Sequence, residues 1–234
     1  MRCDRRSLKR EDSKQLNKRS LSFVFETTDV LRMYVDYELF ANNHPFVLIL
    51  GGEDIKRSLY LLRTRKDADI ILIGGLIGKL GLIAKGHDIG SDKSLLEKKG
   101  VLEFLTEIKY VLKDNKNIIL PLDLCYEENG QRCNVTVFEF PAKKITGDIG
   151  ERTIAQYKNV VLNAKVTVFS DVLGDVNKNI FQKGTFDVLN AFNQNRNFKF
   201  ICGEKISKMA EYKKIKYDFS GSDLPVALLN NPKR

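Results

Sequence analysis

The sequence predicts an α/β fold, a three-layer α/β/α Rossmann-like domain built on a parallel sheet of about six strands. From residue 45 onward, short apolar runs rich in β-branched residues alternate with longer amphipathic stretches, as in βαβ units. The apolar runs are nearly continuous, which is typical of parallel strands covered on both faces. Four of the five runs lead into turns that contain glycine or aspartate.

Each predicted strand is a short run dominated by isoleucine, leucine, valine and phenylalanine. Rossmann-like sheets place their first strand in the middle, so we expect the strand order 3-2-1-4-5-6. The strands that can be located are Phe46–Leu50, Ile70–Ile73, Ile118–Leu120, Val166–Phe169 and Phe198–Cys202.

Between the strands, apolar residues recur at three- and four-residue spacing, which predicts helices with one buried face. Gly90–Lys93 marks a loop between two helices. Val135–Phe140 alternates like a half-exposed antiparallel strand, and with Leu124–Tyr126 and the Asn129-Gly130 turn it predicts a small hairpin beside the sheet. The predicted helices are Ile55–Arg63, Leu76–Ala84, Leu95–Lys113, Glu151–Asn163, Gly184–Asn193 and Ile206–Lys213.

Charge separates a basic leader from the rest of the chain. The formal net charge is +9, and residues 1–20 contain eight basic and three acidic residues. Because this leader has few apolar residues, we expect residues 1–30 to be a flexible arm and residues 31–234 to be one domain. An organelle-targeting peptide and an RNA-binding tail are both consistent with such an arm.

The rest of the composition favours an ordinary cytoplasmic protein, with the mitochondrion or another organelle as the alternative. The sequence has neither a long uncharged apolar run that would predict a membrane span nor the apolar centre of a secretory signal. Its four cysteines include no CxxC pair, and two histidines complete no zinc set, so we expect reduced thiols and no metal site. The cysteines are Cys3, Cys125, Cys133 and Cys202.

Glycines gather directly after the predicted strands. Because the carboxyl ends of parallel strands meet at one edge of a sheet, where helix N-termini favour phosphate, these glycines mark a candidate nucleotide cleft. Ordinary turn chemistry is the alternative for each pair taken alone. Gly74 to Lys79 is not a Walker phosphate loop, because only three residues separate its glycines and Leu80 replaces the hydroxyl residue that binds magnesium.

Residues 31–230, taken in order, resemble the C-terminal lobe of phosphoglycerate kinase. His44–Gly52 is similar to the family's R-P-F-x-A-I-L-G-G strand, and Asp69–Gly75 to its D-x-x-I-I-G-G-G strand and turn. The other similar segments are Met33–Phe40, Gly86–Gly90 with Ser94-Leu95, Leu120–Asp123, Gly147–Gly150 with Thr153-Ile154, and Lys183–Thr185. The resemblance implies a lobe that holds ADP or ATP, with a cleft at Gly51, Gly52, Gly74, Gly75, Leu95, Gly174 and Gly203.

The sequence departs from the family where phosphoryl transfer would occur. The family's G-G-A-K lysine is replaced, since Glu53 and Asp54 follow the glycines here. The family's ribose-binding glutamate corresponds to Asn177, and its magnesium-assisting aspartate to Lys205. Its S-T-G-G-G-A turn reads Phe219–Leu224. A like-charge contact of 4 Å costs roughly 4 kcal/mol at an effective dielectric of about 20, so these changes predict poor ATP affinity.

We therefore expect a non-catalytic pseudoenzyme with no catalytic residues and a vestigial nucleotide cleft. It would bind ATP or ADP with magnesium only if that cleft still functions. Residues 1–30 contain no counterpart of the family's N-terminal lobe for 3-phosphoglycerate. A protein partner is expected to cover the face that such a lobe would contact, so the chain would be a protein-binding or structural subunit of a larger assembly. A divergent kinase or nucleotide binder working with a separate lobe is one alternative, and an RNA-associated basic module is another.

Overall fold

The apolar runs of the sequence form a six-stranded parallel sheet in the computed structural model, which describes residues 39–221. Every pair of neighbouring strands in it is parallel. Numbered along the chain, the six strands lie in the order 3-2-1-4-5-6, so the predicted order is confirmed. Side by side, they are β3 (Ile118–Ile119), β2 (Ile70–Ile73), β1 (Phe46–Leu50), β7 (Val166–Ser170), β8 (Phe198–Cys202) and β9 (Phe219–Gly221).

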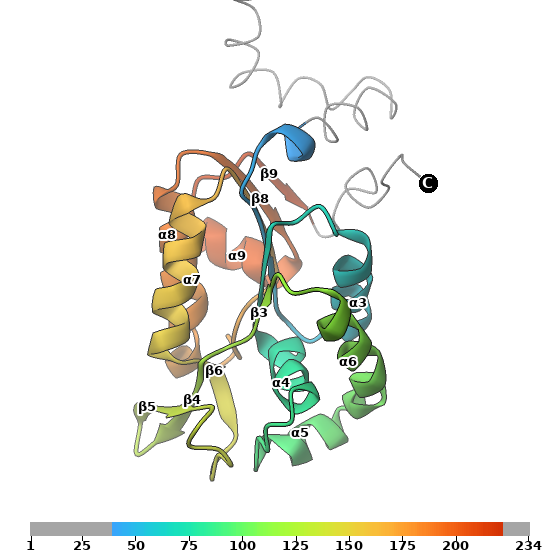
Figure 1. Cartoon of the computed structure of the whole chain (residues 1–234). Coiled ribbons are helices and arrows are strands. Elements are labelled where there is room, and N and C mark those ends of the chain that lie inside the picture. Colours follow the sequence, from blue (N-terminus) through green and yellow to red (C-terminus); the bar gives the residue numbers. More distant parts are fainter. Residues whose placement is uncertain (1–38, 222–234) are drawn as a thin grey trace, which may run out of the picture.

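Helices cover both faces of this sheet, which gives the predicted three layers (Figure 1). Successive residues of the central strand β1 point to opposite faces, as the pleat requires. Phe46, Leu48 and Leu50 belong to one apolar core, and Val47 and Ile49 to the other. The first core is covered by α3 (Ile55–Thr64), α4 (Gly75–Ala84) and α6 (Leu105–Asp114), the second by α7 (Glu151–Asn163), α8 (Lys183–Gln194) and α9 (Glu204–Tyr212).

One predicted helix is wrong. The structure divides Leu95–Lys113 into α5 (Asp92–Lys98), a short 3-10 turn η2 (Val101–Phe104) and α6. Gly100, between the first two, has a φ of 67°, the left-handed conformation that ends helices. Helix α5 also begins inside the predicted loop Gly90–Lys93. The other predicted helices agree with the structure to within two residues at each end.

A three-stranded antiparallel sheet lies beside the carboxyl edge of the large one (Figure 1). Its strands are β4 (Asp123–Glu128), β5 (Gln131–Thr136) and β6 (Thr146–Ile149), in the order β5-β4-β6. The predicted hairpin is present, but its second strand, predicted as Val135–Phe140, is misplaced. The chain turns after Thr136, whose backbone N–H donates to the Glu139 carboxylate at 2.8 Å.

The described part of the chain begins with a helical turn, residues 39–42. The centroid of the Phe40 ring lies 4.9 Å from that of the Phe46 ring and 5.6 Å from that of the Phe200 ring. The predicted arm (residues 1–30), most of Met33–Phe40 and the end of Phe219–Leu224 lie outside the described residues. Within residues 39–221, no helix has the length and hydrophobicity of a membrane span.

Candidate functional site

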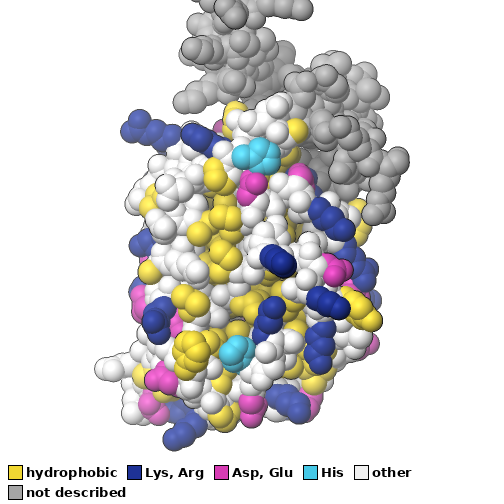
Figure 2. Space-filling model, viewed as in Figure 1, with side chains coloured by type: hydrophobic (Ala, Val, Ile, Leu, Met, Phe, Trp, Pro, Cys, Tyr) yellow, Lys and Arg dark blue, Asp and Glu magenta, His cyan; other side chains and the backbone are white. Residues whose placement is uncertain are grey.

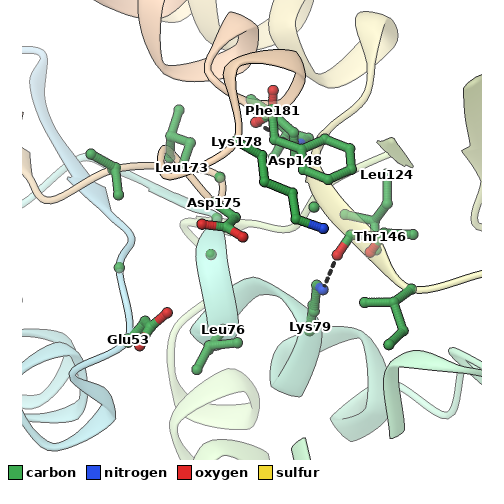
Figure 3. A pocket seen from close by; sticks show the side chains of 18 of the residues that line it. Glu53, Leu76, Lys79, Leu124, Thr146, Asp148, Leu173, Asp175, Lys178 and Phe181 are labelled. Atoms are coloured by element: carbon green, nitrogen blue, oxygen red, sulfur yellow. Dashed lines mark hydrogen bonds between the residues drawn. The ribbon is translucent and has the colours of Figure 1, made fainter. Parts of the chain in front are cut away.

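A cavity of about 570 Å³ opens at the carboxyl edge of the parallel sheet (Figure 3). Its wall comes from the turns after β1, β2 and β7, from the first turn of α9, from α4 and α5, and from the three-stranded sheet. The structure brings five of the seven predicted cleft residues into this wall: Gly52, Gly74, Gly75, Leu95 and Gly174. Gly51 and Gly203 lie outside it, at the end of β1 and at the N-cap of α9.

The glycines allow three turns to pack against one another. Backbone N–H groups of Gly52 and Gly75 donate to the carbonyls of Val172 and Leu173, at 2.6 and 2.9 Å. A Cβ on Gly51 would overlap the carbonyl of Val172. Close packing of the backbone therefore accounts for these glycines, and the evidence for a ligand is the cavity itself rather than the glycine pattern.

Apolar side chains form much of the cavity wall. Leu76 comes from α4, Leu124 from β4, Leu173 from the turn after β7, and Phe181 from the short 3-10 turn η3 (Asn179–Phe181). Each of the four is buried in the protein while still lining the cavity. Such a wall suits the apolar body of a small organic ligand.

A buried ion pair joins three parts of the wall. The Lys79 ammonium donates to Asp92 Oδ1 at 2.6 Å and to the Thr146 carbonyl at 2.5 Å, as Figure 3 shows for Thr146. Thr146 Oγ1 donates to Asp92 Oδ2 at 2.6 Å. Burial lowers the pKa of Lys79, while the charge of Asp92 opposes that change. The pair ties α4, α5 and β6 together and matches the Lys79 charge inside the protein.

A second buried ion pair holds the loop between β7 and α8. Asp148 accepts from Arg132 Nη1 at 2.8 Å and from the backbone N–H of Gly184 at 2.7 Å. Arg132 Nη1 also donates to the Ile180 carbonyl at 2.6 Å. Burial raises the pKa of Asp148 to about 6, although these hydrogen bonds and the Arg132 charge favour its ionised form. The loop that carries Gly174 and Phe181 is thus fixed to the three-stranded sheet.

Carboxylates surround the turn between β1 and α3. Asp54 is the N-cap of α3, and its Oδ1 accepts from the backbone N–H of Arg57 at 2.9 Å. Glu53 lines the cavity and pairs with Lys99 at 3.1 Å. Asp171 has a φ of 69° and packs its carboxylate against Gly52. Asp54 therefore occupies the helix N-terminus that would otherwise offer a free N–H group to an anion, and Glu53 and Asp171 add negative charge in the adjoining turns.

Sequence reasoning identified only part of this site. Glu53 and Asp54 were visible as departures from a family pattern, and Asp148 lies in a matching D-I-G segment. Arg132 and Asp92 gave no signal, because single charged residues in polar segments are usually solvated. Burial raises the pKa of Asp171, and the charges of Lys205 and Arg57 oppose that rise. Only the fold brings these three residues close to one another.

Comparison with known proteins identifies one family. The family model described as phosphoglycerate kinase matches residues 33–221. The phosphoglycerate kinase of Methanopyrus kandleri is 34% identical over 170 residues, which are 70% of this chain and 42% of the relative. That of Pyrococcus furiosus is 30% identical over 176 residues, with the same coverage. The chain thus spans less than half the length of these relatives.

Two solved structures share the fold. Phosphoglycerate kinase from Pyrococcus horikoshii OT3 superposes with a TM-score of 0.75 at 23% identity, covering 86% of this chain and 52% of that one. The enzyme from Coxiella burnetii gives a TM-score of 0.67 at 19% identity, covering 84% and 54%. In both cases the similarity extends over about half of the larger protein.

Proposed function

Because the chain belongs to the phosphoglycerate kinase family, we propose that it is a non-catalytic member, a pseudoenzyme that keeps the lobe fold as a protein-binding or structural module. The observation that carries this proposal is the set of carboxylates at the turn between β1 and α3. Asp54 caps α3 with its own side chain, and Glu53 lines the cavity beside it. One like-charge contact with a phosphate would cost roughly 4 kcal/mol, or about a thousandfold in affinity.

The cations around the cavity support the same proposal. Phosphoryl transfer depends on positive charge placed at the transferring group. Of the four lysines that line the cavity, Lys79 pairs with Asp92, Lys99 pairs with Glu53, and Lys205 lies within electrostatic reach of Asp171. Most of the positive charge is thus already matched by carboxylates of the protein, which leaves little for a polyphosphate.

An open sheet edge supports a protein partner. Strand β3 is the outermost strand on one side of the parallel sheet, and Ile118 and Ile119 are only half-buried. Figure 2 shows hydrophobic side chains along the middle of the face where Figure 1 places β3. With only two residues, β3 offers little backbone for another strand to pair with. It is therefore the apolar side chains on this face that favour contact with a protein partner.

An ATP-forming assay tests the proposal. The purified chain is mixed with 1,3-bisphosphoglycerate, ADP and magnesium, alone and with a separately produced N-terminal lobe of the Methanopyrus kandleri enzyme. The full-length Methanopyrus kandleri enzyme serves as positive control. We expect no ATP formation in either mixture. Turnover in the second mixture alone would instead support the alternative of a divergent kinase that works with a separate lobe.

A further inference from the structure

We propose that the amino edge of the parallel sheet, where its strands begin, binds a single strand of nucleic acid. The phosphates would contact a cluster of basic side chains, and one base would stack on Tyr212. This surface lies at the opposite edge of the sheet from the cavity, so it does not depend on the proposed function. The basic side chains, called the amino-edge cluster, are Lys165, Arg196, Lys213, Lys214 and Lys216.

The fold gathers the amino-edge cluster from three separate parts of the chain. Lys165, Arg196 and Lys216 come shortly before β7, β8 and β9, which are parallel neighbours in the sheet, so the starts of these strands lie side by side. The backbone N–H of Phe198 donates to the Lys165 carbonyl at 3.1 Å. The backbone N–H of Lys216 donates to Oδ1 of Asn193, near the end of α8, at 2.9 Å. Residues that are distant in the sequence therefore share one surface.

Within residues 39–221, no carboxylate forms an ion pair with the amino-edge cluster, although all five side chains are exposed. At the cavity, by contrast, Lys79 and Lys99 are both paired with carboxylates. Helices α7, α8 and α9 end at the amino edge, and their negative C-terminal ends also favour cations. That structural role affects stability, whereas cations without an ion-pair partner are available to an anionic ligand. The two roles can therefore be separated by experiment.

The basic leader is attached to the domain at the same edge. The described part of the chain begins at residue 39, and the Phe40 ring centroid lies 5.6 Å from that of Phe200 on β8. In Figure 1 this helical turn, coloured blue, lies beside β8 and β9. Residues 1–20 contain eight basic and three acidic residues. The leader therefore brings further positive charge to the edge that carries the amino-edge cluster, and one polyanion can contact both.

An exposed aromatic ring beside these cations favours a nucleic acid over other polyanions. Tyr212 ends α9, and its side chain is 78% exposed. The Lys213 ammonium lies 5.4 Å from the centroid of the Tyr212 ring and 4.5 Å from that of Phe186. Bases stack on exposed aromatic rings while nearby cations contact the phosphates, a combination typical of single-strand binding without sequence preference. A duplex keeps its bases stacked on one another, so only a single strand can use Tyr212.

Fluorescence anisotropy tests the stacking with the purified full chain. The probes are a labelled RNA strand of about 12 nucleotides, the matching DNA strand and an RNA duplex of equal length. We expect both single strands to bind, and Tyr212→Ala to weaken them about tenfold while duplex binding stays unchanged. Tyr110→Ala, which removes a 66% exposed ring from α6, is the control and should change neither.

Three results of this experiment overturn the inference. The first is that neither single strand binds, and the second is that Tyr212→Ala has no effect or weakens single strands and duplex equally. The third is that the chain binds vesicles containing phosphatidylserine but no nucleic acid.

A set of charge variants tests the amino-edge cluster itself. Combining Lys165→Gln, Arg196→Gln and Lys216→Gln should lower the slope of log affinity against log salt by about 2, because each phosphate contact with a single strand contributes about 0.7. The control removes the same charge from exposed positions in α3, α5 and α6 and should lower the slope by less than about 0.7. It combines Lys56→Gln, Lys93→Gln and Lys109→Gln.

Thermal unfolding of both combined variants separates binding from a structural role. A purely structural cluster would lower stability at the helix ends and leave the salt slope unchanged, which overturns the inference. Equal changes of slope in both combined variants would mean that only net charge matters, and they overturn it as well.

Discussion

Asp54 illustrates how one side chain can occupy a place that an anion would otherwise take. Its carboxylate accepts from the backbone N–H of Arg57 and so satisfies one of the free donors at the start of α3. The favourable end of the helix dipole then faces a charge that belongs to the protein. A ligand phosphate at this point would have to displace that contact and also approach Glu53.

Replacing both carboxylates tests this role. In the variant Glu53→Ala with Asp54→Lys, the repulsion is removed and a cation is added, so we expect ATP affinity to rise by about a hundredfold or more. ATP formation from 1,3-bisphosphoglycerate should remain absent, because positioning of both substrates is still required. Calorimetry measures the change in ATP affinity, and the ATP-forming assay measures turnover. Unchanged ATP affinity in the variant would show that the carboxylates are not the obstacle.

Asp148 has a structural role that can be measured by its removal. Its side chain is fully buried and compensates Arg132. Truncation in Asp148→Ala leaves the Arg132 charge without this partner, so we expect the free energy of unfolding to fall by about 3 to 5 kcal/mol. Glu211→Ala, at an exposed position of α9, is the control and should change it by less than about 0.5 kcal/mol. Equal effects in urea denaturation would contradict this account of the pair.

The His44–Asp69 contact predicts a pH dependence. The side-chain hydrogen bond to Asp69, 2.5 Å long, raises the pKa of His44 above its usual value of 6.5. A group with a raised folded-state pKa contributes stability that is complete below its unfolded pKa and is lost as the pH rises through the folded value. The stability of wild type relative to His44→Gln should therefore be greatest between about pH 5 and 6.5 and decline above it. A difference that does not vary with pH would contradict the assignment.

At the scale of elements, Gly100 decides where a long amphipathic segment divides. The apolar spacing in Leu95–Lys113 fits one helix, and only the conformation of Gly100 separates α5 from the turn η2. A Cβ at Gly100 would meet nothing within 4 Å, so the cost of a side chain there is purely conformational. Gly100→Ala should lower the free energy of unfolding by about 1 to 2 kcal/mol.

Denaturant titration checks that value, and Gly86→Ala serves as a second test of the same effect. Gly86 also has a positive φ, 94°, and open space around it, so it should show a loss of the same kind. No loss in either variant would mean that the chain relaxes into another turn without cost, which would contradict the role given to Gly100.

The sequence predicted the elements to different degrees, for physical reasons. Strands such as Phe46–Leu50 were located correctly because burial on both faces demands an unbroken apolar run. Strand β6 (Thr146–Ile149) was not predicted as a strand, because its threonine, glycine and aspartate serve the buried ion pairs and the approach of Phe181 rather than a repeating pattern. The second hairpin strand was misplaced because alternation continues past Thr136, where a side-chain contact turns the chain.

At the scale of the whole molecule, the glycines after the strands were enough to predict where the cavity lies. The pairing of charges around the cavity could be seen only in the folded structure. Residues far apart in sequence, such as Lys79 and Thr146 or Glu53 and Lys99, meet only when the sheet and its turns are assembled. Pairing of this kind cannot be read from local composition. Five of the seven cleft positions could be placed from the sequence, whereas the internal matching of charges could not.

The most direct test of the non-catalytic account is calorimetric titration of magnesium ATP into the purified chain at low ionic strength. The account predicts no saturable binding up to about 1 mM, because phosphates in the cavity would meet Glu53 and cations that are largely engaged within the protein, while Asp54 already occupies the start of α3. Binding with a dissociation constant of about 10 µM or lower would contradict it, since affinity of that order requires positive charge that the site would then have to supply.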